Sequence, residues 1–258
     1  MKTKKLISFL AGMLMSIVAY GQYVGMTFTA NTVEGVEMTF SVTSTTDKTV
    51  QVGEGGYYSP AIDRSTTGSI TIPATVSYGG VTYQVTSIGG SAFRGCSSLT
   101  SVGDLSSYTS IAYYAFEDCT SLTSVGDLSS CTSIGEQAFC GCTSLTSVGD
   151  LSSCTSIETN TFRGCSRLTT VGDLSSCTFI GTYAFLECFS LSSVGDISSC
   201  TSIGNSAFQD CYSLTSFTFP NSVTNIGNHA FDHCTGLTSI TIPKSVTSIG
   251  EFAFFRCI

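Results

Sequence analysis

The chain has 258 residues, of which 18 are acidic and ten basic, so its formal net charge is −8 at neutral pH. Three of the basic residues lie within the first five positions, and the rest of the chain carries a net charge near −11. A chain this acidic is a poor partner for nucleic acid, whose phosphates bind basic surfaces. It has no tryptophan and 26 glycines, but its apolar residues recur at fixed spacing, which indicates an ordered fold.

Residues 1–21 have the pattern of a secretory signal peptide. Three lysines precede an apolar run over residues 6–18, and small residues near position 21 offer a cleavage site. A membrane anchor is the alternative, but the run is short for a span and no basic stop-transfer cluster follows it. Residue 22 is Gln rather than the Cys of a lipoprotein. We therefore expect a secreted or cell-surface protein with no membrane span after cleavage.

Residues 22–68 show a two-residue alternation instead of a longer repeat. From position 36 to position 43 apolar and polar residues alternate, which is typical of a half-buried strand. Residues 23–29 and 49–53 are weaker strand candidates, and Gly55, Gly56 and Pro60 mark a loop. A stack of repeats has to cover the edge of its first repeat. We expect residues 22–68 to form an N-terminal β-rich cap.

Residues 69–258 are organised by a 23-residue period. One phenylalanine recurs at this spacing without a slip: Phe93, Phe116, Phe139, Phe162, Phe185, Phe208, Phe231 and Phe254. A leucine does the same from Leu99 to Leu237. A divergent first repeat carries a hairpin around Gly79 and Gly80. Such a period predicts a solenoid in which like residues stack at about 4.8 Å per rung.

The last repeat carries three motifs in order: L-x-x-I-x-I-P over residues 237–243, V-T-S-I-G over 246–250 and A-F-x-x-C over 253–257. Together they resemble the BspA-like leucine-rich repeat family of bacterial surface proteins, over residues 69–258. The resemblance implies a mainly β solenoid, a right-handed superhelix of 23-residue repeats with a parallel sheet on one face and short helical turns on the other. Members are typically exported, and several are adhesins.

Five central repeats depart from that pattern, because Gly-Asp-Leu or Gly-Asp-Ile stands where the last two repeats have Thr, then Ile or Phe, then Pro. We expect the chain to bend at each Gly-Asp, so that the next apolar residue turns inward and the aspartate faces solvent. The aspartates form one column: Asp104, Asp127, Asp150, Asp173 and Asp196. A cation such as Ca²⁺ would offset their mutual repulsion. The favoured alternative is that each carboxylate accepts backbone N–H groups in its own turn, since the spacing of known Ca²⁺ loops is absent.

Twelve of the 13 cysteines lie in two ladders at the repeat period. The second ladder, which begins at Cys131, has Tyr108 and Val246 at equivalent positions, so the slot requires apolar filling. We expect buried thiols, with disulfides between neighbouring rungs as the alternative. Cys140 falls outside both ladders and is the candidate exposed thiol. Neither Cys140 with Cys142 nor His229 with His233 has the partners that a metal site needs.

The positions that change between repeats are the candidate binding residues, because the scaffold does not require their identity. They are Tyr113, Tyr114, Glu136, Gln137, Thr159, Asn160, Thr182, Tyr183, Asn205, Asn228 and His229. Neutral drift on a solvated face is the alternative. A second candidate surface is the hydroxyl-rich face that includes Thr123 and Ser124, which suits a glycan, a protein or, as a weaker alternative, ice.

No catalytic constellation is evident in the sequence, and we expect no enzyme and no cofactor. The leading hypothesis is an adhesin-like binding protein, secreted or at the cell surface, that recognises an extracellular protein or glycan of a host or another microbe. This hypothesis rests on the family resemblance. The alternative is a structural spacer or a module that associates with itself through the C-terminal edge of the solenoid.

Overall fold

The structure of the protein is a computed structural model that describes residues 22–257. The expected signal peptide therefore lies outside the described residues. Between residues 22 and 257 the chain forms strands and turns only. The strands are β1 (Thr27–Asn31), β2 (Glu37–Ser44), β3 (Thr49–Val52), β4 (Gly68–Ser69), β5 (Thr75–Tyr78), β6 (Val81–Ile88), β7 (Leu99–Ser101), β8 (Ser110–Ile111), β9 (Ser133–Ile134), β10 (Ser147–Val148), β11 (Ser156–Ile157), β12 (Thr170–Val171), β13 (Phe179–Ile180), β14 (Ser193–Val194), β15 (Ser202–Ile203), β16 (Asn225–Ile226) and β17 (Ser248–Ile249).

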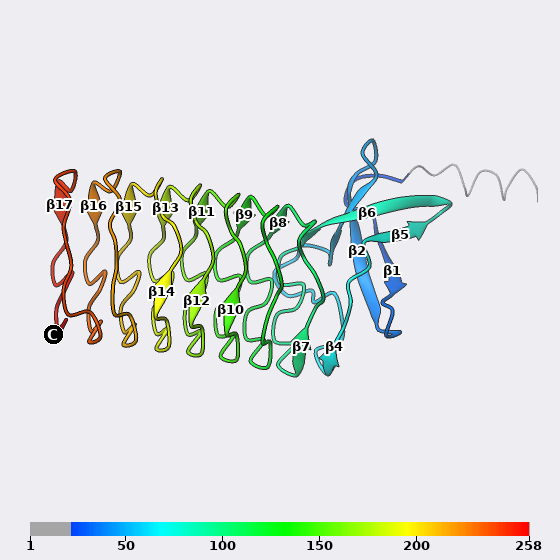
Figure 1. Ribbon diagram of the computed structural model, residues 1–258. Helices are drawn as coiled ribbons and strands as arrows, with labels where there is room; N and C mark the ends of the chain where they lie inside the picture. The colour runs from blue at the N-terminus through cyan, green and yellow to red at the C-terminus, as the bar shows by residue number, and fades with distance from the viewer. Residues whose placement is uncertain (1–21, 258) are drawn as a thin grey trace, which may run out of the picture.

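The N-terminal strands form a small antiparallel unit at one end of the molecule (Figure 1). β1 pairs with β2 and β2 with β3, both antiparallel. The expected alternation is present in β2, where Met38, Phe40 and Val42 are buried and Glu37 is exposed. The expected hairpin joins β5 to β6. Because β3 also pairs with β6 in parallel, this unit and the solenoid share one sheet.

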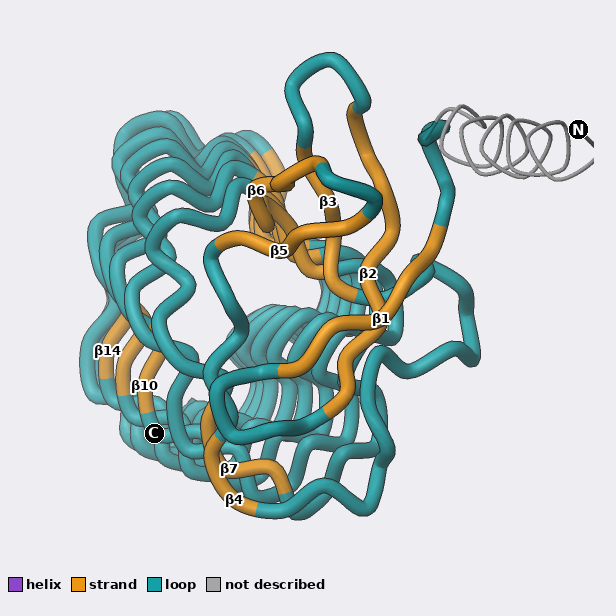
Figure 2. Tube along the Cα trace, turned by 90° about the vertical axis from the view of Figure 1, so that its right-hand side faces the viewer, coloured by secondary structure: helices purple, strands orange, loops and turns teal. Residues whose placement is uncertain are grey.

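The solenoid repeats the same short strands once per rung. From β6 onward the long sheet is parallel, in the order β6, β8, β9, β11, β13, β15, β16 and β17, and partners lie 23 residues apart, as Ile111 and Ile134 do. A second parallel sheet joins β10, β12 and β14, and a third joins β4 and β7. Viewed along the solenoid, the rungs superpose (Figure 2). The 23-residue period is therefore the length of one turn, as the sequence predicts.

The core is built from columns of identical residues. The rings of the stacked phenylalanines lie 5.0–5.4 Å apart, centre to centre, with planes within 14° of parallel. This spacing is close to the separation of neighbouring strands. Leu105, Leu128 and Leu151, which follow the Gly-Asp bends, are fully buried while the aspartates before them are exposed. The predicted inward turn at Gly-Asp is therefore confirmed.

The connecting segments differ from the expected short helical turns, because no helix occurs in residues 22–257. Two residues of each rung have a left-handed backbone, among them Tyr183 (φ 58°) and Glu187 (φ 63°). This conformation turns their N–H groups toward the next rung, where they donate to the carbonyl oxygens of Asn205 and Gln209. A helix would keep these donors within its own segment. Bonding between rungs therefore replaces helical bonding.

Candidate functional site

A pocket of about 580 Å³ lies where the N-terminal unit meets the solenoid, over strands β8, β9 and β11. We call it the tyrosine pocket. Its lining residues come from four segments of the chain. One is the loop before β4, which supplies Tyr57, and the other three are β8, β9 and β11, each with the turn that follows it. They are Tyr57, Ser110, Ile111, Ala112, Tyr113, Tyr114, Ser133, Ile134, Gly135, Glu136, Ser156 and Glu158. The pocket brings together three of the predicted binding residues, Tyr113, Tyr114 and Glu136.

Tyr113 is held in place on two sides. Its hydroxyl donates a hydrogen bond of 2.8 Å to the carbonyl oxygen of Gly55 in the N-terminal unit. Its ring lies against Gly90, where an added Cβ would come within 2.7 Å of the ring carbon Cζ. Position 90, two residues after β6, therefore has to lack a side chain for the ring to lie there. A fixed aromatic ring loses little conformational entropy when a ligand contacts it, which favours binding.

A cluster of aromatic rings borders the pocket and already holds one cation. The guanidinium carbon of Arg94 lies 5.2 Å from the ring centre of Tyr57, 5.6 Å from that of Tyr58 and 5.0 Å from that of Tyr114. Its Nε lies 2.5 Å from a carboxylate oxygen of Glu117. Burial raises the pKa of the Glu117 carboxyl, and the charge of Arg94 opposes that rise. The distances of 5.0–5.6 Å between the Arg94 guanidinium and the three rings are within the range at which ring faces attract a cation.

The hydroxyl of Tyr114 stays neutral well above physiological pH. A hydrogen bond to Tyr57, together with burial, raises the pKa of Tyr114 to about 12. Gln137, another predicted residue, donates to the same hydroxyl at 3.1 Å. Gln137 therefore contacts a residue of the pocket and does not itself line it.

One repeat position identifies the pocket independently of its shape. In the long sheet, the residue after the isoleucine that ends each strand is usually glycine: Gly89, Gly135, Gly181, Gly204, Gly227 and Gly250. We call this the Ser-Ile-Gly position, although Phe179 and Asn225 replace the serine in two rungs. At Gly135, Gly181 and Gly204 an added Cβ would lie 2.5–2.6 Å from backbone atoms of the preceding rung. The equivalent positions that carry side chains are Ala112 and Glu158, and both line the tyrosine pocket. Departures from a local packing rule are expected where function requires them.

The remaining predicted binding residues do not join this site. The side-chain oxygens of Asn205 and Asn228 accept backbone N–H groups of the next rung at 2.8 and 2.9 Å, so they bond between rungs. Nδ1 of His229 lies 2.9 Å from a carboxylate oxygen of the buried Asp232, and Nδ1 of His233 lies 2.7 Å from the other oxygen. The further predicted positions follow the solenoid beyond the pocket: Thr159, Asn160, Thr182 and Tyr183.

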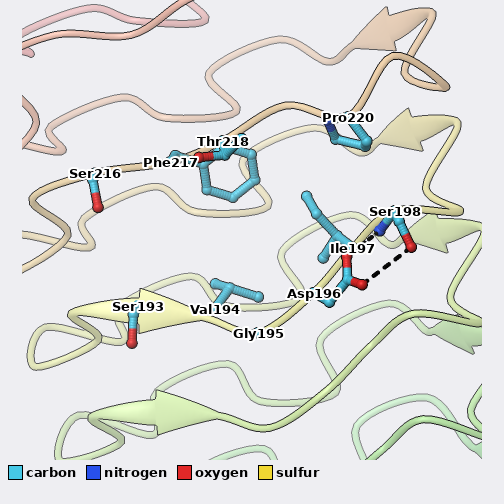
Figure 3. Close-up of a pocket in the computed structure, with 10 residues that line it drawn as sticks. All are labelled: Ser193, Val194, Gly195, Asp196, Ile197, Ser198, Ser216, Phe217, Thr218 and Pro220. Atoms are coloured by element: carbon cyan, nitrogen blue, oxygen red, sulfur yellow. Dashed lines mark hydrogen bonds between the residues drawn. The ribbon is translucent and has the colours of Figure 1, made fainter.

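Each aspartate of the column accepts a backbone N–H group in its own turn, which is the alternative that the sequence favours over a cation site. Figure 3 shows Asp196 beside a smaller cavity of about 230 Å³, where the Gly-Asp repeats give way to the repeats with proline. Its carboxylate accepts the backbone N–H of Ser198 at 2.8 Å and the hydroxyl of Ser198 at 3.3 Å. The other four aspartates accept the N–H two residues on at 2.7–2.9 Å. Among residues 22–257 no three metal-ligating side chains converge.

The hydroxyl-rich face is tied to the backbone in a similar way. The hydroxyl of Thr123 donates to the carbonyl oxygen of Thr100, 23 residues earlier, and that of Thr146 donates to Thr123 in turn. A parallel ladder runs beside the long sheet from Thr109 to Thr247. These hydroxyls support the stacking of the rungs, and their oxygens alone remain as acceptors on the surface.

Sequence reasoning missed Tyr57 and Glu158 as members of the site. Tyr57 lies outside the repeat, so no periodicity points to it. Arg94 follows one of the repeating phenylalanines, at a position whose variation between repeats marks candidate contact residues. Glu158 left a signal that could have been used, because glycine occupies the equivalent position in six of the eight rungs.

The architecture is that of a leucine-rich repeat solenoid. Six copies of the BspA type leucine-rich repeat region match the chain, over residues 69–192 and 132–258. The chain therefore belongs to the BspA-type leucine-rich repeat family, as the sequence motifs indicate. None of the curated proteins matches it.

Several solved structures share the fold. A leucine-rich cell surface protein of Faecalibacterium prausnitzii A2-165 is 31% identical, with a TM-score of 0.71 over 88% of this chain and 55% of that protein. A leucine-rich repeat protein of T. pallidum is 23% identical, with a TM-score of 0.69 over 83% of this chain and 95% of that one. One from Eubacterium ventriosum is 24% identical, with a TM-score of 0.62 over 84% and 51%. The chain spans about half the length of the Faecalibacterium and Eubacterium proteins. Over residues 22–257 the structure offers no helix long and apolar enough to cross a membrane.

Proposed function

We propose that this chain is a non-enzymatic, adhesin-like binding protein, secreted or displayed at a bacterial cell surface. It contacts an extracellular protein or glycan through the tyrosine pocket. The observation that carries the proposal is the coincidence at the Ser-Ile-Gly position: the two side chains that replace glycine, Ala112 and Glu158, line the same pocket. The family and the cell-surface relative from Faecalibacterium support the location.

The lining of the pocket supports binding rather than catalysis. Its ionisable side chains are Glu136, Glu158 and three tyrosines, and neither histidine nor cysteine reaches it. A nucleophile paired with a base is the usual requirement for group transfer. Rigid tyrosines that present large ring faces are typical of binding surfaces.

The test is a binding screen on arrays of extracellular matrix proteins and glycans, followed by pocket variants against whichever array member binds. Tyr113→Ala removes the fixed ring, and Glu158→Gly restores the residue that the repeat normally has. We expect each to weaken binding at least tenfold while leaving the circular dichroism spectrum unchanged. Tyr183→Ala is the matched control, because Tyr183 is 40% exposed and Tyr113 is 38% exposed.

Two outcomes would contradict the proposal. Binding that survives Tyr113→Ala and Glu158→Gly places the contact elsewhere on the solenoid. Silence on both arrays, together with light scattering that shows oligomers growing with concentration, favours the structural and self-associating alternative.

A further inference from the structure

The tyrosine pocket combines aromatic rings with carboxylates and has no positive charge in its lining. Of its 12 lining residues, two are glutamates, three are tyrosines and none is Lys, Arg, His, Asn or Gln. Glu136 is exposed and Glu158 is half-buried, so neither carboxylate is neutralised by a basic neighbour in that lining. The pocket therefore presents negative charge next to ring faces whose own quadrupole is negative.

The hydrogen-bond donors near the pocket are largely used within the protein. The hydroxyl of Tyr113 donates to the carbonyl oxygen of Gly55. The hydroxyl of Ser156 donates to a carboxylate oxygen of Glu158 at 2.6 Å, which fixes that carboxylate beside β11. The lone pairs of Glu136 and the second oxygen of Glu158 are what remain for a ligand, along with the hydroxyls of Ser110 and Ser133. A ligand that matches this lining has to bring donors.

The chain itself shows how the rings next to the pocket hold a donor-rich cation. The guanidinium of Arg94 lies among the rings of Tyr57, Tyr58 and Tyr114, with Glu117 as its counter-ion. Its Nη1 is buried and has no hydrogen-bond partner among the described residues, so the ring faces are its environment. Tyr57 and Tyr114 belong to this cluster and also line the pocket.

We infer that the tyrosine pocket binds a basic side chain, lysine or arginine, of an extracellular protein; the inference rests on the proposed function. The aliphatic stem contacts Tyr57 and Tyr113, and the charged end contacts Glu136 and Glu158. Ring faces and carboxylates both stabilise a cation, and the effect grows as the cation loses its water. A neutral glycan fits less well, because sugar hydroxyls need protein donors as well as acceptors and the lining offers few. The net negative charge of the whole chain also favours the approach of a basic partner.

The test uses the full chain with ¹³C-labelled tyrosine rings and three small probes, observed by NMR. The probes are the Nα-acetyl methylamides of lysine, arginine and Nε-acetyllysine. We expect the first two to shift the ring signals of Tyr57 and Tyr113 in a saturable way that weakens as salt is raised. Nε-acetyllysine has nearly the same shape without the charge, and we expect at least tenfold weaker binding.

The double variant Glu136→Gln, Glu158→Gln removes the charge and keeps the shape of both side chains. We expect it to weaken lysine and arginine binding at least tenfold. Glu251→Gln is the matched control, because Glu251 is exposed and occupies the same repeat position as Glu136, far along the solenoid. The control should bind like the unmodified protein.

The outcomes separate this inference from the proposed function. Equal binding of lysine and Nε-acetyllysine, or no loss in the double variant, overturns the cationic ligand. If the basic probes fail while an array glycan depends on Tyr113, the pocket is the binding site but its ligand is a glycan. If the probes leave Tyr57 and Tyr113 unshifted and array binding survives Tyr113→Ala, both fail.

Discussion

The thiol of Cys142 donates a hydrogen bond of 3.1 Å to the main-chain carbonyl oxygen of Phe116, in the preceding rung. The same carbonyl accepts the backbone N–H of Cys119, so both of its lone pairs are used. The contact recurs from the Cys119 thiol to that of Cys257, each reaching the phenylalanine 26 residues earlier. The first cysteine ladder is therefore a column of donors as well as of apolar filling. All 13 cysteines are free thiols in the structure.

Cys142→Ala should destabilise the protein by about 1–2 kcal/mol, because it removes a buried sulfur and its hydrogen bond. Denaturant unfolding under reducing conditions measures the change. Cys140→Ala is the control, since Cys140 is only half-buried and makes no such ladder contact. We expect about 0.5 kcal/mol or less there. Equal losses in both variants would show that the ladder hydrogen bond contributes nothing.

The fold could be predicted because every rung has the same apolar residues to bury, at the same spacing. A phenylalanine and a leucine at one spacing leave a stack of equivalent turns as the only arrangement that buries all of them. The turns themselves could not be predicted in detail. Tyr183 and Glu187 have left-handed backbones, yet most of the equivalent residues are not glycine. The signal was weak: Gly95, Gly141 and Gly164 occupy the same repeat position as Glu187.

The site was only half predictable for a related reason. Variation between repeats identified Tyr113 and Glu136, because it marks positions that the core does not constrain. It also selected Asn205 and Asn228, whose side chains bond to the next rung. Variation alone cannot distinguish these two cases. Tyr57 reaches the pocket only because the N-terminal unit folds against the solenoid, and that contact has no period.

Gly204→Ala should destabilise the solenoid by about 1–3 kcal/mol, by the usual cost of overpacking. A Cβ there would lie 2.6 Å from the carbonyl carbon of Gly181, which is backbone and cannot rotate away. Alanine restricts the unfolded chain and would otherwise stabilise by roughly 0.4–1 kcal/mol. We expect the overlap to exceed this gain, as measured by thermal and denaturant unfolding. A more stable Gly204→Ala variant would mean that the rungs can separate locally.

Glu187→Gly should stabilise the protein by about 1 kcal/mol. Glu187 has φ 63°, a conformation that disfavours residues with a Cβ by roughly 1–2 kcal/mol. Glycine adopts it freely, and Gly164 does so in the preceding rung with φ 72°. The control is Gln209→Gly, because position 209 has no left-handed backbone and glycine there only adds freedom to the unfolded chain. We expect the control to be destabilised; a gain of stability in both variants would contradict the backbone argument.

Chelation of Ca²⁺ should leave the melting temperature unchanged, because the aspartates already have protein partners. Asp150 accepts the N–H of Ser152 at 2.7 Å. Asp150→Ala should therefore cost about 1 kcal/mol with or without Ca²⁺, as loss of a turn-capping acceptor does. Asp150→Asn keeps the acceptor and should cost less. A melting temperature that rises with Ca²⁺ and falls with Asp150→Asn would instead indicate a bound cation along the column.

The protein should lose stability steeply above about pH 9. Burial raises the pKa of the Cys96 and Cys200 thiols to about 11 and that of Cys154 to about 12, against an ordinary 9.0. The more deeply buried thiols, such as that of Cys165, are also raised. Because the folded pKa values lie above the unfolded ones, the stabilisation is complete below pH 9 and is lost as the pH rises through the folded values. Each such thiol then removes about 1.4 kcal/mol per pH unit.

Denaturant unfolding between pH 7 and pH 11, under reducing conditions, measures this slope. Val246 shows that valine fits the slot of the second ladder. Replacing Cys131, Cys154, Cys177 and Cys200 together by valine removes four titrating thiols, so the alkaline slope should fall by up to about 6 kcal/mol per pH unit. The free energy of unfolding at pH 7 should change little, since valine still fills the slot. An unchanged slope would place the alkaline transition on other groups, of which the buried thiols of the first ladder, such as Cys165, are the first to examine.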